Sequence, residues 1–160
     1  MRELVVCSVK GGTGKTTVAA AFASLAEDFV LADCDVDAAN LHLVMDPVVE
    51  TTTPFIAGHT AVIRAADCAA CGECAALCRF DAVNAIPDGR GGMAYAVDPL
   101  QCEGCGVCVR FCSADAIDFP ERHCGEWMIS DTRTGPMVHA RLGVAAENSG
   151  KLVTTVRQRA

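Results

Sequence analysis

The chain has 160 residues, of which 51% are hydrophobic and 21% charged, and its formal net charge is −7. It contains no apolar stretch near the roughly 20 residues that a membrane-spanning helix requires, so we expect no membrane span and a cytoplasmic location. The acidic balance disfavours nucleic acid as a partner, because binding to its phosphates needs clustered positive charge. Eleven cysteines without a secretory signal indicate a reducing compartment, where thiols bind metal.

The first predicted elements are a strand, a glycine-rich loop and a helix. Residues 3–8 form a short run rich in β-branched side chains, bounded by glycines, which predicts a buried strand. Val18, Ala21, Phe22 and Leu25 then recur at helical spacing, which predicts a helix that packs on a sheet through this apolar stripe. Strand, loop and helix in this order are the context of a phosphate-binding loop.

The loop between them reads K-G-G-T-G-K-T-T and predicts a phosphate site. Glycines let successive N–H groups turn toward phosphate oxygens, and the start of the helix adds the positive end of its dipole. We expect Lys15 to reach the β and γ phosphates of a nucleotide and the Thr16 hydroxyl to bind Mg²⁺. The alternative is an ordinary glycine turn. The candidate binding residues are Lys10, Gly11, Gly12, Thr13, Gly14, Lys15, Thr16 and Thr17.

The loop departs from the strict phosphate-loop pattern at Val9, where that pattern has glycine, and it carries a second lysine at Lys10. This version resembles the deviant Walker A motif of the MinD/ParA/Mrp group of ATPases. The resemblance implies that Lys10 contacts nucleotide across a homodimer interface.

Residues 29–32 predict a second strand, followed by an acidic segment that includes Asp33 and Asp35. Ligands bind at the carboxyl ends of strands in open α/β sheets. The segment resembles the D-x-D-x4-N-L switch I of the same ATPases, which implies that Asp35 positions the attacking water or the Mg²⁺ shell and that Asp33 supports it. Lys10, Lys15 and Asp35 are therefore the candidate catalytic residues. The alternative is a solvated acidic loop.

Two cysteine runs, each C-x2-C-x2-C-x3-C, occupy the middle of the chain, and the second repeats the first at an offset of 34 residues. Three closely spaced thiolates can reach three irons of one [4Fe–4S] cube, and the fourth ligand must come from elsewhere. In the bacterial two-cluster arrangement the fourth cysteine of each run ligates the other cluster. That arrangement assigns one cube to Cys68, Cys71, Cys74 and Cys112, and the other to Cys102, Cys105, Cys108 and Cys78.

The rival interpretations are a pair of zinc sites and a disulfide framework. Zinc usually takes two C-x2-C knuckles and leaves no use for the third closely spaced cysteine of each run. Disulfides require export, and no secretory signal is visible. One departure from the bacterial pattern is that Arg79 and Ser113 follow the last cysteines, where proline is usual.

The segments around the cysteine runs complete the predicted order. Residues 47–59 predict a linker, residues 61–64 and 95–98 predict a short strand before each run, and residues 87–92 predict a loop between the halves. After residue 120, two strands over 127–135 and 137–142 are expected around a turn at Gly135 and Pro136, followed by a final helix that ends at Ala160.

This order of parts is similar to MinD-superfamily P-loop ATPases that carry an inserted two-cluster ferredoxin domain. The resemblance implies an α/β fold class, with an incomplete P-loop NTPase parallel sheet and an inserted α+β ferredoxin-like domain. It places the first part of the ATPase domain at 1–57, the ferredoxin domain at 58–120 and the return to the ATPase domain at 121–160. Members of the family continue with a strand that bears a Walker B aspartate. No such segment occurs here, so we expect an N-terminal fragment.

The resemblance also implies a function. We expect an iron–sulfur, ATP-binding protein that couples nucleotide binding to electron transfer or to iron–sulfur cluster handling. Its implied cofactors are two [4Fe–4S] clusters, ATP and Mg²⁺, and its implied partners are a second copy of the full-length protein and a redox protein. The alternatives are a ferredoxin-like electron carrier whose phosphate loop is only a scaffold, and an inactive fragment.

Overall fold

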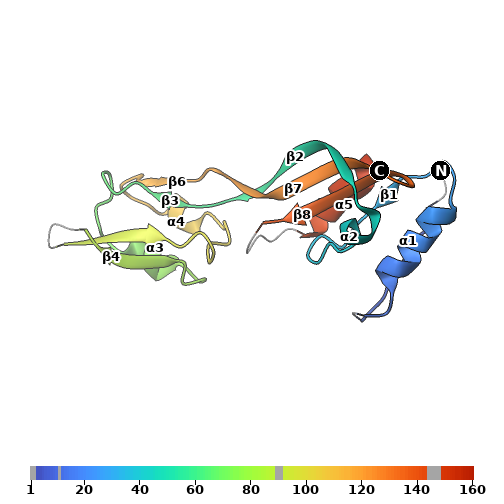
Figure 1. The fold of residues 1–160 in the computed structure, drawn as a ribbon. Helices are drawn as coiled ribbons and strands as arrows, with labels where there is room; N and C mark the ends of the chain where they lie inside the picture. The colour runs from blue at the N-terminus through green and yellow to red at the C-terminus, as the bar shows by residue number, and fades with distance from the viewer. Residues whose placement is uncertain (1–2, 11, 89–91, 144–148) are drawn as a thin grey trace. The chain divides into compact units, whose positions relative to one another are not determined.

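The computed structural model describes residues 3–10, 12–88, 92–143 and 149–160 (Figure 1). The described chain falls into two compact units. The first consists of the residues up to 55 together with 124–160, and the second consists of residues 56–123. We refer to them as the first and second unit.

The first unit is built on a four-stranded sheet in the order β1-β8-β7-β2. β1 (Leu31–Ala32) pairs with β8 (Gly135–Leu142) in parallel, and β8 pairs with β7 (Glu121–Thr132) in antiparallel. β2 covers Val48–His59. The sheet is therefore mixed, and the expectation of a parallel sheet is wrong for this part of it, because a tight turn joins β7 to β8 and only antiparallel strands can be joined in that way.

The turn of this hairpin lies at residues 133–134, two residues before the predicted Gly135–Pro136 turn. The Thr132 hydroxyl accepts hydrogen bonds from the backbone N–H groups of Thr134 and Gly135, each at 3.2 Å, and donates one to the carbonyl of Gly135 at 2.7 Å. A threonine hydroxyl that satisfies the turn in this way explains why the strand ends there.

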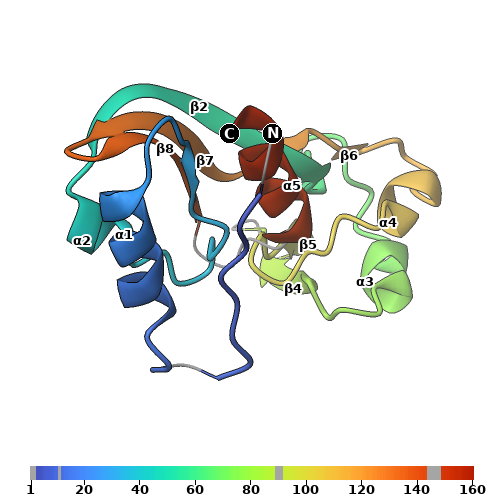
Figure 2. The same cartoon turned by 90° about the vertical axis from the view of Figure 1, so that its right-hand side faces the viewer.

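Three helices accompany the sheet: α1 (Lys15–Leu25), α2 (His42–Met45) and α5 (Ser149–Arg159). α1 contacts α2 (Figure 2). α5 packs against β8, with Leu152 and Val156 fully buried, and the Arg159 guanidinium lies 5.1 Å from the centre of the Trp127 ring. The core beneath α1 and α2 consists of Ala20, Ala23, Leu41, Met45 and Met137.

The predicted helix after the glycine loop is confirmed, but it buries a different face from the one expected. Val18 is 44% exposed, Phe22 49% and Leu25 83%, whereas Ala20 and Ala23 are buried. The two alanines lie on the opposite side of the helix from the predicted stripe. Their small side chains pack in the core that Leu41 and Met45 of the α2 segment help to form.

Two other expectations are wrong. Residues 3–8 form no strand, and Leu4 and Val5 are 70% and 67% exposed. A strand needs a hydrogen-bonding neighbour, and none of the described strands pairs with this segment. Residues 48–59, expected as a linker, form the long strand β2, because valine and threonine favour an extended backbone.

The second unit contains two short antiparallel sheets, in which β3 pairs with β6 and β4 with β5. The two short strands predicted before the cysteine runs are confirmed as β3 and β5. α3 packs against α4, and the small core contains Ala61, Ala82, Cys102 and Ile117. The elements are β3 (Val62–Ile63), α3 (Glu73–Leu77), β4 (Val83–Pro87), β5 (Met93–Val97), α4 (Val107–Arg110) and β6 (Ile117–Asp118).

Arg64 joins the two ends of this unit. Its guanidinium donates to the carboxylate of Asp67 at 2.7 Å, to the carboxylate of Asp118 and to the backbone carbonyl of Asp115. The segment before Cys68 is thus held to the segment after Cys112 by three charge-assisted hydrogen bonds.

Candidate functional site

The glycine loop ends in the backbone geometry that begins a helix. Gly12 and Gly14 have φ angles of +75° and +87°, in the left-handed region that favours glycine, and Gly14 caps α1. The carbonyl of Lys10 accepts hydrogen bonds from the Ser8 and Thr13 hydroxyls, each at 3.1 Å. These bonds hold the described part of the loop together in front of the helix.

A lysine and two aspartates meet at the carboxyl end of β1. The Lys15 ammonium lies 3.7 Å from a carboxylate oxygen of Asp35. Asp33 directly follows β1, its backbone N–H donates to the carbonyl of Val138 at 2.9 Å, and its Oδ1 accepts the N–H of Asp35 at 3.1 Å. The structure therefore brings the loop lysine to the end of the strand.

Asp33 differs from its neighbours in its burial. Only 7% of the residue is exposed, and its Oδ2 has no hydrogen-bond partner among the described residues. Burial raises the pKa of this carboxyl, and the nearby Asp35 raises it further, although the hydrogen bond from the Asp35 N–H opposes both. A buried acceptor without a partner is a position where a water or ligand donor can bind.

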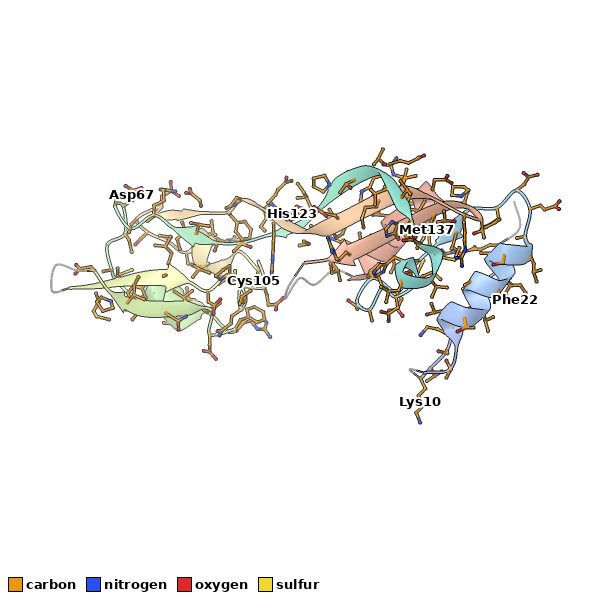
Figure 3. All side chains as sticks on the ribbon, viewed as in Figure 1. Lys10, Phe22, Asp67, Cys105, His123 and Met137 are labelled. Atoms are coloured by element: carbon orange, nitrogen blue, oxygen red, sulfur yellow. The ribbon has the colours of Figure 1, made fainter. Side chains whose placement is uncertain are left out.

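The other predicted loop residues lie at more open positions. Lys10 is exposed and extends from the end of the loop into solvent (Figure 3). Thr17 is exposed and Thr16 half-buried, both in the first turn of α1. Gly11, also predicted to bind phosphate, lies outside the described residues.

The eight cysteines of the two runs line two hollows in the second unit, and all eight thiols are free. Three cysteines of one run and the last cysteine of the other run contribute to each hollow. The first hollow is lined by Cys68, Cys71, Cys74 and Cys112, and the second by Cys78, Cys102, Cys105 and Cys108.

Left-handed glycines shape the loops around both hollows. Gly72 and Gly106 have φ angles of +78° and +72°, and they cap the short helices α3 and α4 that carry Cys74 and Cys108. Gly104, at φ +64°, packs so closely on the backbone of His59 that a Cβ would lie 2.3 Å from its carbonyl oxygen. Glycine is thus required there by both conformation and space.

Burial raises the pKa of the Cys74 and Cys108 thiols, and neighbouring cysteines of the same runs raise it further. A positively charged metal group reverses this tendency, because a coordinating thiol is deprotonated outright. In the part of the chain that the structure describes, no three His, Cys, Asp or Glu side chains lie close enough together to hold a single metal ion.

Several residues at these sites are not indicated by sequence motifs. Tyr95 lines the first hollow, and Phe80 and Phe119 line the second. All three lie outside the cysteine runs, so the cysteine spacing does not indicate them. The 34-residue repeat only shows which residue occupies the equivalent position in the other half. Ser130 and His139 form a buried pair in the β7–β8 hairpin, with 2.8 Å between Oγ and Nε2. No spacing rule marks that pair.

A glycine loop that opens a helix, with its lysine beside aspartates at the end of a strand, is the arrangement of a P-loop nucleotide-binding domain. The sequence model of the CobQ/CobB/MinD/ParA nucleotide binding domain family, CbiA, matches residues 4–158. The chain belongs to this family. The expectations of a P-loop and of nucleotide binding are thereby confirmed.

A relative is found in Methanocaldococcus jannaschii. The chain is 35% identical to its uncharacterized protein MJ0578 over 85 residues, which is 51% of this chain and 30% of that protein. The match thus spans less than a third of the relative's length. Among the described residues, no helix is long and apolar enough to cross a membrane.

Proposed function

We propose that this chain is an iron–sulfur protein that binds ATP and Mg²⁺ at its phosphate loop and holds two [4Fe–4S] clusters in its second unit. The main support for the proposal is the set of cysteines that lines each of the two hollows. Each is lined by three cysteines of one run and the fourth cysteine of the other. Two-cluster ferredoxins of the bacterial type share their ligands in the same way.

The donor set of each hollow suits the proposed group. A [4Fe–4S] cluster takes four thiolates, one for each iron, and each hollow offers four free thiols. Much of the remaining lining is apolar, with Ile63 and Ile117 in the first hollow and Val83 and Val97 in the second. An apolar surround limits the access of solvent to the metal. Zinc is the alternative occupant, since it also accepts four thiolates, at about 2.3 Å from a single ion.

The first unit supports the nucleotide part of the proposal. Lys15 would exchange the Asp35 carboxylate for phosphate oxygens, and Thr16 at the start of α1 would provide a hydroxyl to Mg²⁺. Asp35 would position the attacking water or the Mg²⁺ shell. The buried, unpartnered Oδ2 of Asp33 would accept a hydrogen bond from a water of that shell.

The proposal extends to coupling between the two functions. One chain holds both a phosphate loop and eight free thiols in two sets of four. This is the basis for inferring that nucleotide binding alters the reduction potential or the solvent exposure of the clusters. Lys10 is exposed at the end of its loop, and we place it against the nucleotide of a second copy of the chain. In electron transfer, a separate redox protein would exchange electrons with the clusters. In cluster handling, a recipient protein would accept the clusters themselves.

A ferredoxin-like electron carrier is the second candidate function. It is favoured by the fact that all eight cysteines of the two runs lie in one compact unit, residues 56–123. In that case the clusters transfer electrons and the nucleotide has no effect on them.

Substitution of Cys78 and Cys112 tests whether these two cysteines bind the proposed clusters. Cys78→Ser and Cys112→Ser should each disturb a different cluster, and each should lower the iron bound after anaerobic reconstitution from about eight to about four per chain. Cys7→Ser, an exposed cysteine outside the runs, is the matched control and should retain all the iron. Retention of about eight irons in Cys78→Ser or in Cys112→Ser, or loss of iron in Cys7→Ser, would argue against the proposed ligands.

A second experiment separates the coupled protein from the plain carrier. The midpoint potentials of the reconstituted protein are measured with and without Mg-ATP. The coupled protein should show a shift that Lys15→Gln abolishes, because this variant loses the phosphate contact. The carrier should show the same potentials under all conditions.

A further inference from the structure

The 34-residue repeat allows the two hollows to be compared position by position. Ile63, Ala116 and Ile117 line the first hollow, and the residues 34 positions away from them, Val97, Ala82 and Val83, line the second. The two linings are thus related by the repeat, and most of their equivalent positions carry similar apolar side chains. The equivalent positions at which the two linings differ can therefore be identified directly.

Three equivalent positions differ in chemistry. One pair is Ala69 in the first hollow and Glu103 in the second, and the other two pairs involve aromatic residues. Tyr95 lines the first hollow, while its counterpart Ala61 lines the second. Phe80 lines the second hollow, while its counterpart Ala114 lines the first. The first hollow therefore has a phenol hydroxyl where the second has a methyl group, and the second has a phenyl ring where the first has a methyl group.

Other charges and rings do not cancel this difference. Each hollow has one carboxylate in its lining, Glu73 in the first and Glu103 in the second. The second hollow gains a further aromatic ring from Phe119, which stacks on His59 with 4.8 Å between ring centres. The first hollow is thus the one with a neutral hydrogen-bond donor, and the second is the more aromatic.

The Tyr95 hydroxyl lies against the loop that carries two of the cysteines. Its oxygen is 2.6 Å from the position that a Cβ would occupy at Gly72, between Cys71 and Cys74. The hydroxyl makes no hydrogen bond to any residue that the structure describes. The hydroxyl thus lies beside Gly72, in the loop between Cys71 and Cys74, which both line the first hollow.

We infer, on the basis of the proposed iron–sulfur function, that the two cysteine sets hold clusters of unequal reduction potential and that the Tyr95 hydroxyl raises the potential of the first. One electron from a low-potential one-electron donor protein converts one ferric iron to ferrous, and no bond is formed or broken. The added negative charge is stabilised by a hydrogen bond to sulfur, and hydrogen bonding and solvent exposure are among the factors that set such potentials. The aromatic lining of the second hollow offers no such donor. The first set therefore accepts the first electron.

The test is an anaerobic redox titration of the reconstituted full chain, followed by electron paramagnetic resonance. The unsubstituted protein should show two reduction waves with different midpoint potentials. Cys112→Ser should remove or alter the wave with the higher potential. Tyr95→Phe should lower that wave alone, by about a tenfold change in the one-electron equilibrium, which is about 59 mV, and leave the iron content unchanged. Phe111→Tyr, which adds a hydroxyl at a 55% exposed position that lines neither hollow, should leave both waves in place.

A second measurement needs no mutation of the gene. Tyr95 is the only tyrosine of the chain, so growth with meta-fluorotyrosine, whose hydroxyl is a stronger donor, changes this group alone. The higher wave should then rise. Equal potentials for the two sets, or no response of the higher wave to either change, would overturn the inference while the iron remains bound. Failure to bind iron and sulfide at all would instead overturn the proposed function.

Discussion

The ammonium of Lys15 and the carboxylate of Asp35 lie 3.7 Å apart, although one residue belongs to the start of α1 and the other follows β1. The pair joins the phosphate loop to the carboxyl end of a strand. Both side chains are partly exposed, so the pair itself contributes little to stability. Its importance lies in keeping the lysine at the site where phosphates are expected.

Replacing Lys15 should therefore affect binding and not folding. Lys15→Gln should weaken Mg-ATP binding about 10- to 100-fold, since a hydrogen bond to a charged group contributes about 1.5–3 kcal/mol. Titration calorimetry measures the affinity, and chemical denaturation checks that the free energy of unfolding changes by less than about 1 kcal/mol. Arg79→Gln, an exposed change of the same charge in the second unit, should leave the affinity unaltered. Unchanged affinity of Lys15→Gln would remove this lysine from the site.

Asp33→Asn should stabilise the nucleotide-free protein at neutral pH. Burial raises the pKa of the Asp33 carboxyl, so its contribution to stability is fully present below the usual value near 3.8 and is lost as the pH rises through the folded-state pKa. Asparagine keeps an oxygen for the Asp35 N–H and removes the buried charge. We expect a gain of about 1 kcal/mol in the free energy of unfolding at pH 7, with no gain at the acid limit.

The exposed Asp37 provides the control for this experiment. Asp37→Asn should change the free energy of unfolding by less than about 0.5 kcal/mol. A loss of stability in Asp33→Asn equal to or larger than that of the control would show that the Asp33 charge is paired in solution.

His139 should make the first unit sensitive to mild acid. Burial lowers the pKa of this imidazole, and the positive charge that His42 can carry lowers it further. Stability is then complete above pH 6.5 and falls as the pH drops through the folded-state pKa, because the unfolded chain binds the proton more readily. Fluorescence of Trp127, the only tryptophan, can follow denaturant unfolding between pH 7.5 and about pH 5.

A histidine substitution distinguishes this effect from general acid unfolding. His139→Gln should flatten the pH dependence of the unfolding midpoint, and the buried Ser130 should keep a hydrogen-bonding neighbour. His123→Gln, at an exposed position, should retain the slope of the unmodified protein. Identical slopes in all three proteins would exclude His139 as the group responsible.

If the chain holds the proposed clusters, Arg64 should slow the loss of iron from the first cysteine set. Its guanidinium ties the segment before Cys68 to Asp115 and Asp118 after Cys112, so its removal frees both ends of that set. Arg64→Ala should release iron to a chelator about threefold to tenfold faster, as measured by absorbance of the iron complex. Arg110→Ala removes an arginine from the last turn of α4 and should release iron at the original rate.

The sequence predicts the parts of the fold that depend on local chemistry. Left-handed glycines at 12 and 14 and the helix that begins at Lys15 follow from the loop sequence and the helical spacing after it. The repeated order of strand, helix and strand in the second unit follows from the 34-residue repeat. In each case neighbouring residues are sufficient to fix the conformation.

The parts that were mispredicted depend on contacts with distant residues. The apolar run at 3–8 has strand-like residues, but none of the strands that the structure describes pairs with it. Its Glu3 instead accepts a hydrogen bond from Arg157 of α5 at 2.8 Å. The face of α1 that is buried depends on Leu41 and Met45, which no periodicity within α1 can reveal. Tyr95 reaches the first hollow from β5, so spacing within the first cysteine run cannot indicate it.

The most direct test of the proposed function is the metal and sulfide content of the chain purified and reconstituted without oxygen. Two [4Fe–4S] clusters predict about eight irons and about eight acid-labile sulfides per chain, with a brown colour that dithionite bleaches. A colourless protein with about two zinc ions per chain and no labile sulfide would contradict the account.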